Sequence, residues 1–205
     1  MSEGEQPDDA STDPDPTDIP LDVRAGAILR SRDLASLDLS ARDLSGADLT
    51  GASLARAKLV ESDLTGAHLR RADLGGAILR DASLFGADLG HANLIGAELQ
   101  GADLRKAEAA EATLFHAKLM TADLRNVSAP GADLSWASLI DADLREADLT
   151  DADLFEADLR HADLRGARLK GAQLKGAELR GAKVDDATVW PEGFDHAALG
   201  PATGD

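Results

Sequence analysis

The sequence predicts an all-β solenoid, and two regularities predict it. Starting at Leu29, one position recurs every fifth residue as far as Val189, in an uninterrupted frame of 33 five-residue units, and leucine fills this central position in 29 of them. Alanine stands two residues before the centre in 28 of the 33 units. Such short tandem repeats favour a solenoid, in which each coil contacts only the coils beside it.

A period of five fits neither an α-helix nor a flat sheet. On a helix with 3.6 residues per turn, successive leucines would be rotated by roughly 140° and would spiral around the surface. In a flat strand the side chains alternate between two faces, so an odd spacing would place successive leucines on opposite faces. The backbone must therefore turn within every unit, because only then do all of the central residues stay inside the coil.

The outward positions indicate four units per coil. Arginine recurs at a spacing of 20 residues directly after the centre, and aspartate recurs at the same spacing directly before it. The two series are Arg105, Arg125, Arg145 and Arg165, and Asp103, Asp123, Asp143 and Asp163. We expect the two series to form a self-neutralising charge ladder on one face, in which each ion pair is weak.

Many units match a single motif, as in Ala47-Asp48-Leu49-Thr50-Gly51 and Ala92-Asn93-Leu94-Ile95-Gly96. With these units the chain resembles the pentapeptide-repeat family, whose motif is close to Ala-(Asp/Asn)-Leu-x-x. The resemblance covers about four fifths of the chain. It implies a right-handed, quadrilateral (four-sided) β-helix solenoid of about eight coils, in which the central residue and the residue two before it point inward. At about 4.8 Å per coil, the rod would be roughly 40 Å long.

The core must be built from leucine and alanine, because only 3% of the residues are aromatic and the chain has no tyrosine. Burial of each leucine contributes roughly 1.5–3 kcal/mol, which chain entropy largely offsets. Aspartate is frequent directly before the centre, although it is a poor strand residue. We expect its short carboxylate to bond backbone groups at the corners of the coil.

The two ends of the chain differ from the repeats. Residues 1–20 carry seven acidic and no basic residues, which predicts an acidic disordered tail. This end has no apolar segment of the kind found in secretory signal peptides, and no apolar run in the chain is long enough to span a bilayer. We therefore expect a soluble, cytoplasmic protein. Because there is no cysteine, disulfides and thiolate metal sites are excluded.

The solenoid itself is expected over residues 21–189, with a cap at each end. An open coil exposes both its core and the edges of its strands, so it needs a cover. Leu21 and Val23 alternate with polar residues and predict a short cap strand before the first coil. Residues 190–205 are expected to form a C-terminal cap and a frayed tail, in which Trp190 and Phe194 make an apolar lid.

Two central positions interrupt the run of leucines inside the rod. Ala109 and Ala129 replace leucine one coil apart, and Pro130 follows the second of them. One interpretation is a tolerated local pinch or kink that Val127 partly refills, since cores accept compensated changes of volume. The other is a bend or a recognition notch.

No residues in the sequence are arranged as an active site, and we expect a protein that is not an enzyme. The five histidines do not share the paired spacing that a metal site needs, so no metal and no cofactor is expected. Carboxylates are frequent, but they lie in regular rows on a convex surface, whereas acid–base catalysis needs a cleft with perturbed groups. Phosphate-binding and nucleophile-elbow motifs are absent from the sequence.

One apolar stripe on the outside is the candidate interface, and we expect it to bind another protein. It combines aromatic and aliphatic residues that follow the centres on two neighbouring faces. Exposed aromatic residues stacked over several coils are unusual in a chain with only four Phe and two Trp, and such patches often mark partner surfaces. The alternative is scattered surface apolarity. The candidate residues are Ile95, Phe115, Met120, Trp136, Ile140 and Phe155.

The resemblance also implies a second hypothesis, a DNA-mimicking modulator or protector of DNA gyrase or topoisomerase IV. Such a protein would bind the enzyme and not nucleic acid itself. The formal charge of −17 agrees with it, but residues 1–25 carry 8 acids and 1 base, and residues 190–205 carry 3 acids. The repeats between them hold 27 acids against 20 bases. Duplex DNA of roughly 40 Å would carry roughly 24 charges, so the rod is a weak mimic. The family also includes end-to-end dimers.

Overall fold

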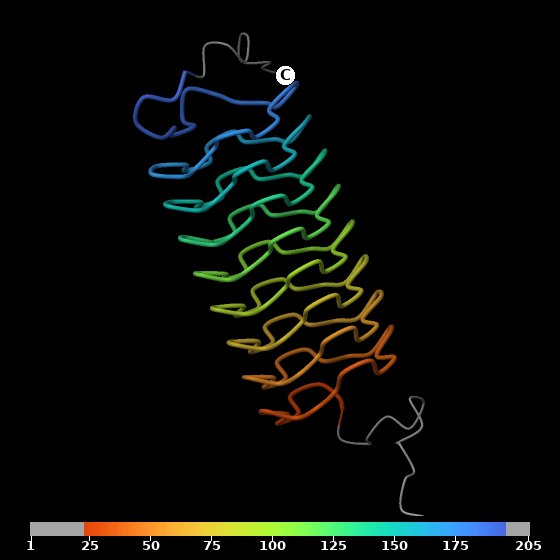
Figure 1. Cartoon of the computed structure of the whole chain (residues 1–205). Helices are drawn as coiled ribbons and strands as arrows, with labels where there is room; N and C mark the ends of the chain where they lie inside the picture. The colour runs from red at the N-terminus through yellow and green to blue at the C-terminus, as the bar shows by residue number, and fades with distance from the viewer. Residues whose placement is uncertain (1–22, 196–205) are drawn as a thin grey trace, which may run out of the picture.

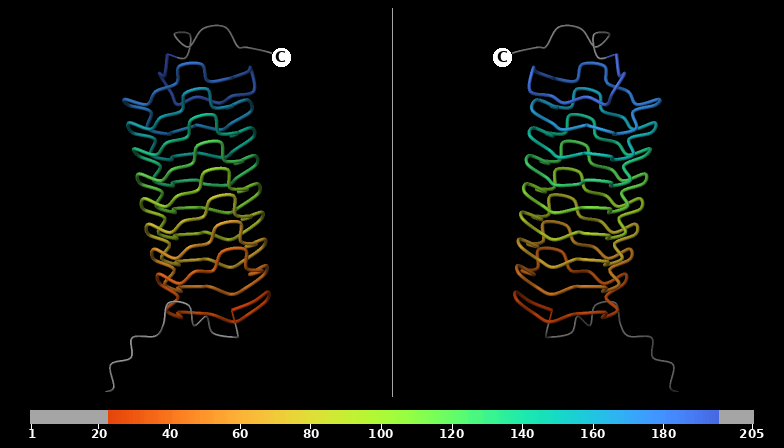
Figure 2. Two further views of the ribbon diagram at one scale, coloured as in Figure 1. Left: turned by 90° about the vertical axis from the view of Figure 1, so that its right-hand side faces the viewer. Right: turned by 90° about the vertical axis from the view of Figure 1, so that its left-hand side faces the viewer.

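The computed structural model describes residues 23–195, which form a straight rod of stacked coils (Figure 1). The chain enters at one end of the rod and reaches the other without reversing direction (Figure 2). Within the described residues the backbone forms no helix and no strand longer than one bridged residue. Single parallel bridges instead join residues 20 apart, from Ile28 and Asp48 to Asp163 and Lys183, and one such bridge occurs in every five-residue unit. The expectation of four units per coil is therefore confirmed.

The hydrogen bonds of one unit explain why aspartate precedes the centre. In the unit centred on Leu49, the N–H groups of Asp48, Leu49 and Gly51 each donate to a carbonyl of a neighbouring coil at 2.8 Å. Ala52 closes a turn by donating to the Leu49 carbonyl at 2.9 Å. The remaining N–H belongs to Thr50, and it donates to Asp48 Oδ1 at 3.2 Å. The aspartate thus satisfies the one backbone donor that the stacked coils leave over, as the sequence led us to expect.

The corner of each unit is a turn whose second residue after the centre has a positive φ. From the unit of Leu29 to that of Leu179 the angle runs from +52° at Ser31 to +77° at Gly176, and 19 residues other than glycine adopt it. Glycine is common at this position because it reaches the left-handed region without steric cost. The other residues accept that cost, and their side chains are directed outward from the corners.

Replacement of a corner glycine is expected to test this packing. Gly171→Ala should lower the free energy of unfolding by about 1.5 kcal/mol, because Gly171 has a φ of +74° and the Asp151 side chain must turn away from the added Cβ. Gly46→Ala is the matched control, since its φ is +62° and nothing lies within 4 Å of the added carbon. We expect a loss of about 1 kcal/mol for the control, measured by urea denaturation. Equal losses would contradict the contact with Asp151.

The core is a column of leucine and alanine inside the rod. Nearly all central residues and the residues two before them are buried, and most of the central leucines have no exposed surface at all. The gap at Ala109 and Ala129 leaves an internal, wholly apolar cavity of about 20 Å³, and Val127 lies in its wall. The backbone ladder continues across it, with Ala109 N donating to Ser128 O at 2.6 Å and Ala129 N to Asp148 O at 2.8 Å. The missing volume therefore lies inside the core, and the rod stays straight there (Figure 1).

The repeating frame does not run without insertion to Val189, and this prediction is wrong. Asp163 pairs with Lys183, 20 residues on, but Arg168 pairs with Val189, 21 residues on. Thr188 is buried where Ala187 was expected, and Val189 is 45% exposed. The extra residue is accommodated at Asp185, whose Oδ1 accepts the N–H of Gly166 at 2.9 Å. Elsewhere in the ladder a backbone carbonyl accepts the corresponding N–H.

The described ends of the rod are closed by apolar side chains. Val23 is buried beneath the first coil, while Leu21 and the predicted tail lie outside the described residues. At the other end, Trp190 takes the inward position after the insertion, and its ring stacks on Phe194 with centroids 5.0 Å apart. Both side chains are half-buried against the core. We propose that these two rings cover the open end of the core.

Candidate protein-binding surface

One face of the rod presents several aromatic side chains to solvent; we call it the aromatic face and define it by its centres Leu94, Leu114, Leu134 and Leu154. Phe115 and Phe155 directly follow two of these centres, two coils apart, and both are half-buried. Trp136 is the corner residue of the coil between them, with a φ of +59°. Because the corner directs its side chain outward, the indole is 48% exposed.

The rings on this face contact one another in sequence along the rod. Phe115 and His116 meet edge to face with centroids 4.3 Å apart, and His116 lies 5.8 Å from Trp136. Trp136 then meets Phe155 edge to face at 6.0 Å. The backbone fixes this order, since Trp136 N donates to Phe155 O at 2.9 Å. We call Phe115, His116, Trp136 and Phe155 the ring cluster.

A serine lies in the middle of the ring cluster. Ser135 occupies the position equivalent to Phe115 and Phe155 in its coil, and it is 8% exposed. Its N–H and its hydroxyl both donate to Asp133 Oδ1, at 2.9 and 2.5 Å. Ser135 is smaller than the two phenylalanines, and its polar groups are satisfied by Asp133. The Trp136 ring lies beside this small residue.

The other residues of the predicted stripe lie beside the ring cluster along the rod and on the neighbouring face. Ile95 is 45% exposed one coil before Phe115, where it lines the end of a shallow surface depression. Met120 and Ile140 are half-buried and follow centres on the neighbouring face. His116 was not predicted as part of the stripe. Its spacing of 20 residues from Trp136 is the signal that places the two rings on one corner.

A second face carries the predicted charge ladder; we call it the arginine face and define it by its centres Leu104, Leu124, Leu144 and Leu164. Arg105 donates to Asp103 through Nε and Nη2 at 2.8 and 2.7 Å. Its Nε also lies 3.6 Å from Asp123 Oδ2 in the next coil. The hydrogen bonds from Arg105 hold the pKa of Asp103 below its ordinary value, against the effect of burial. The same pairing within the unit repeats up to Arg165, so the aspartates and arginines beside these centres neutralise one another.

The described residues hold neither a metal-ligand cluster nor a membrane-spanning helix. Within residues 23–195, no three His, Asp or Glu side chains gather as metal ligands would. The same part of the chain contains no helix long and apolar enough to cross a bilayer. The rod therefore offers surfaces for contact and, among the described residues, no cluster of groups suited to holding a metal.

A comparison with protein families decides the identity of these repeats. The model described as pentapeptide repeats matches residues 33–81, 82–120, 117–154 and 152–189. The chain belongs to the pentapeptide-repeat family. Members of this family fold as right-handed quadrilateral β-helices and are generally structural or binding proteins, not enzymes.

Solved structures of pentapeptide-repeat proteins resemble the chain to different degrees. HetL, from the cyanobacterium Nostoc sp. strain PCC 7120, is 36% identical over 80% of this chain and 85% of its own, with a TM-score of 0.56. HetL is described as a pentapeptide-repeat protein involved in the regulation of heterocyst differentiation. The protein alr5209 from Nostoc PCC 7120 is 38% identical over 58% of this chain and 83% of its own, with a TM-score of 0.28.

A third solved structure is QnrB1, a plasmid-mediated fluoroquinolone resistance protein. It is 21% identical over 70% of this chain and 89% of its own, with a TM-score of 0.37. At this level the resemblance carries no argument about function. None of the curated proteins matches the chain significantly.

Proposed function

We propose that this pentapeptide-repeat protein is a non-enzymatic scaffold that binds another protein through its aromatic face. The ring cluster is the observation that carries the proposal. It gathers three of the six Phe and Trp residues of the chain on one exposed surface, although a soluble rod has no need of aromatic residues outside its core. The regulatory role described for HetL is one that a protein-binding surface can perform.

The ring cluster is well suited to binding because the backbone holds it in place. Each ring stands one or two residues after a buried leucine in a hydrogen-bonded coil, so little backbone freedom remains to be lost on association. Aromatic side chains also supply a large contact area for only two rotatable bonds. Together these features favour tight binding from a small surface.

Removal of the two phenylalanines tests the proposal. Phe115→Ser with Phe155→Ser is expected to reduce capture of the native partner at least tenfold in a pull-down from host lysate, while circular dichroism stays unchanged. Phe85→Ser is the matched control, because Phe85 occupies the same position of its unit on the arginine face, beside Arg105 and Lys106. Equal capture by both variants would reject the ring cluster as the contact surface.

The alternative function is a DNA-mimicking modulator of gyrase or topoisomerase IV. One observation favours it: residues 141–160 carry eight acids and two bases. The arginine face opposes it, because the aspartates beside its centres pair with arginines. A supercoiling assay distinguishes the two functions: a mimic inhibits or protects the enzyme at stoichiometric ratios and loses this effect at high salt, whereas the scaffold leaves supercoiling unchanged.

A further inference from the structure

The aromatic face carries several carboxylates that form no ion pair with a lysine or arginine of the described residues. Around Ile95 and the ring cluster, residues 91–96, 111–116, 131–136 and 151–156 contain five acids and no lysine or arginine. These acids are Glu111, Asp133, Asp151, Asp153 and Glu156. No lysine or arginine of residues 23–195 forms an ion pair with any of them, in contrast to the arginine face. His91 Nδ1 lies 3.3 Å from Glu111 Oε2, and the next coil adds one lysine to this face, Lys175. The acids of the face still outnumber its lysines and arginines by five to one, so the rings lie beside an excess of negative charge.

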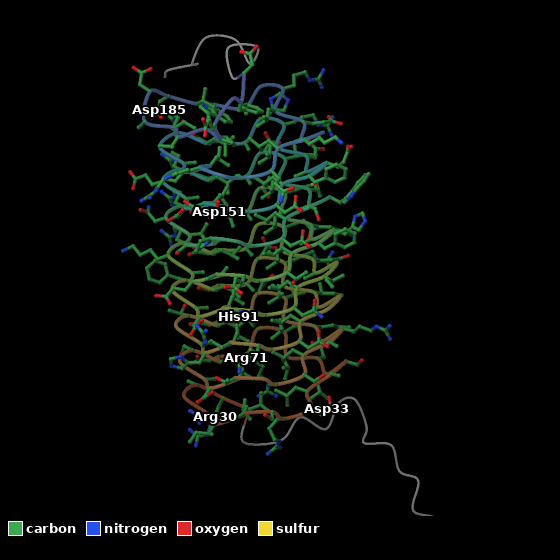
Figure 3. All side chains as sticks on the ribbon, turned by 60° about the vertical axis from the view of Figure 1, so that its left-hand side comes forward. Arg30, Asp33, Arg71, His91, Asp151 and Asp185 are labelled. Atoms are coloured by element: carbon green, nitrogen blue, oxygen red, sulfur yellow. The ribbon has the colours of Figure 1, made fainter. Side chains whose placement is uncertain are left out.

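Two of these carboxylates border the rings at the corners of one coil. Asp151 and Glu156 are exposed corner residues with φ of +57° and +54°, and Phe155 lies between them in the chain. Figure 3 labels Asp151 on the side of the rod that is turned toward the viewer. Glu156 follows Trp136 by 20 residues, so it lies one coil further along the same corner, about 4.8 Å away.

Both carboxylates are exposed, and Lys170 and Lys175 precede the corners of the next coil. The corners beyond Asp151 and Glu156 are Gly171 and Gly176, which have no side chain to cover them. The Glu156 Cδ atom lies only 2.6 Å from where a Cβ of Gly176 would be, so the carboxylate occupies the space that this glycine leaves open. A bound partner can therefore reach the rings and the two carboxylates together.

We infer that the aromatic face binds a basic, amphipathic segment of a partner protein. Apolar side chains of the segment cover the ring cluster, and its lysines or arginines pair with Asp151, Asp153 and Glu156 or lie over the Trp136 indole. A helix along the rod fits this surface, because its pitch of about 5.4 Å is close to the coil spacing of about 4.8 Å. The same carboxylates repel nucleic acid. This inference rests on the proposed function and adds the chemistry of the partner.

A synthetic peptide probe tests the inference on the full-length protein. The probe is a labelled 18-residue amphipathic helix with leucine on one face and arginine on the other, and its partner probe has glutamate in place of arginine. Fluorescence anisotropy is expected to show binding of the arginine peptide that weakens as salt is added, and at least tenfold weaker binding of the glutamate peptide. Comparable affinity for the two peptides would overturn the inference.

A pair of matched variants locates the charge effect. Asp151→Asn with Glu156→Gln should weaken binding of the arginine peptide roughly five- to tenfold at low salt. The control, Asp141→Asn with Glu146→Gln, removes one Asp and one Glu charge from the other two corners of the same coil, where φ is +57° and +60°. The control should change affinity by less than about twofold. Equal effects of the two pairs would mean non-specific attraction and would overturn the inference.

Capture of the native partner by the two sets of variants distinguishes this inference from the proposed function. If the Phe115 and Phe155 variant loses the partner but Asp151→Asn with Glu156→Gln retains it at low salt, the scaffold function stands and the basic partner is wrong. If both variants retain the partner, the aromatic face is wrong and both proposals fail. If both lose it and crosslinks from Asp153 lead to lysines of the partner, both stand.

Discussion

Leu64→Ala is expected to lower the free energy of unfolding by about 4 kcal/mol, the largest effect of any single change considered for this rod. Leu64 has no exposed surface and lies in a column of identical side chains, with Leu44 and Leu84 in the coils on either side. Removal of its isobutyl group loses the transfer free energy of the buried carbons and leaves a cavity that backbone-locked neighbours cannot fill. Urea denaturation followed by circular dichroism measures the loss.

The comparison variant is Leu124→Ala, on the same face of the rod. Leu124 lines the cavity beside Ala109 and Ala129, so part of its surface already lacks contacting atoms. We expect this substitution to cost about 1 kcal/mol less than Leu64→Ala. A larger cost at Leu124 would show that the coils around the cavity depend more strongly on their remaining leucines than the tightly packed coils do.

The five-residue period was sufficient to predict the path of the backbone. A buried leucine every fifth residue can be reached only if the chain turns in every unit, and the 20-residue spacing of Arg105 and Arg125 reports the coil length directly. The role of aspartate also followed from chemistry, since the coil leaves one N–H per unit without a backbone acceptor. Fold and register were therefore readable because each unit repeats the same local requirement.

The departures lie where the repeat pattern is ambiguous. Two frames fit the sequence equally well at this end. The original frame places Ala187 and Val189 inside, and the shifted frame places Thr188 and Trp190 there, so the sequence alone does not reveal the extra residue. The large Trp190 ring covers more of the open end of the core than Val189 could, which favours the shifted frame.

His116 was missed for a related reason. A stripe defined by apolar residues excludes histidine. The His116 ring joins the cluster because it lies beside Trp136.

Asp185→Ala is expected to destabilise the last coil locally and to leave the rest of the rod folded. Asp185 Oδ1 accepts hydrogen bonds from Gly166 N, Ala187 N and Thr188 Oγ1, at 2.9, 3.1 and 3.1 Å. Without the carboxylate, Gly166 loses its acceptor and the extra residue has nothing to hold it. After a discount for its exposed position, the loss is about 2 kcal/mol. Figure 3 shows Asp185 at one end of the rod, where a local opening need not spread.

Hydrogen exchange measures this local opening. The amides of Gly166 and Leu169, which donate to Asp185 Oδ1 and to Val189 O, are expected to exchange roughly 30-fold faster in Asp185→Ala, while the amide of Leu64 is unchanged. Asp186→Ala is the matched control, because Asp186 is an exposed neighbour of the same charge. Accelerated exchange at Leu64 as well would show that the coils unfold together and not one at a time.

The same carboxylate makes the last coil sensitive to acid. The hydrogen bond from the Gly166 N–H, followed by those from Thr188 and Ala187, lowers the pKa of Asp185 below its ordinary value. A group whose pKa is lower in the folded state contributes stability above its unfolded pKa of about 4 and loses it as the pH falls through the folded value. Exchange at Gly166 corrected for intrinsic rates should therefore be constant from pH 7 to about pH 5 and accelerate below about pH 4. In Asp185→Ala this acid dependence should disappear, because the group that titrates is gone and the coil is already open.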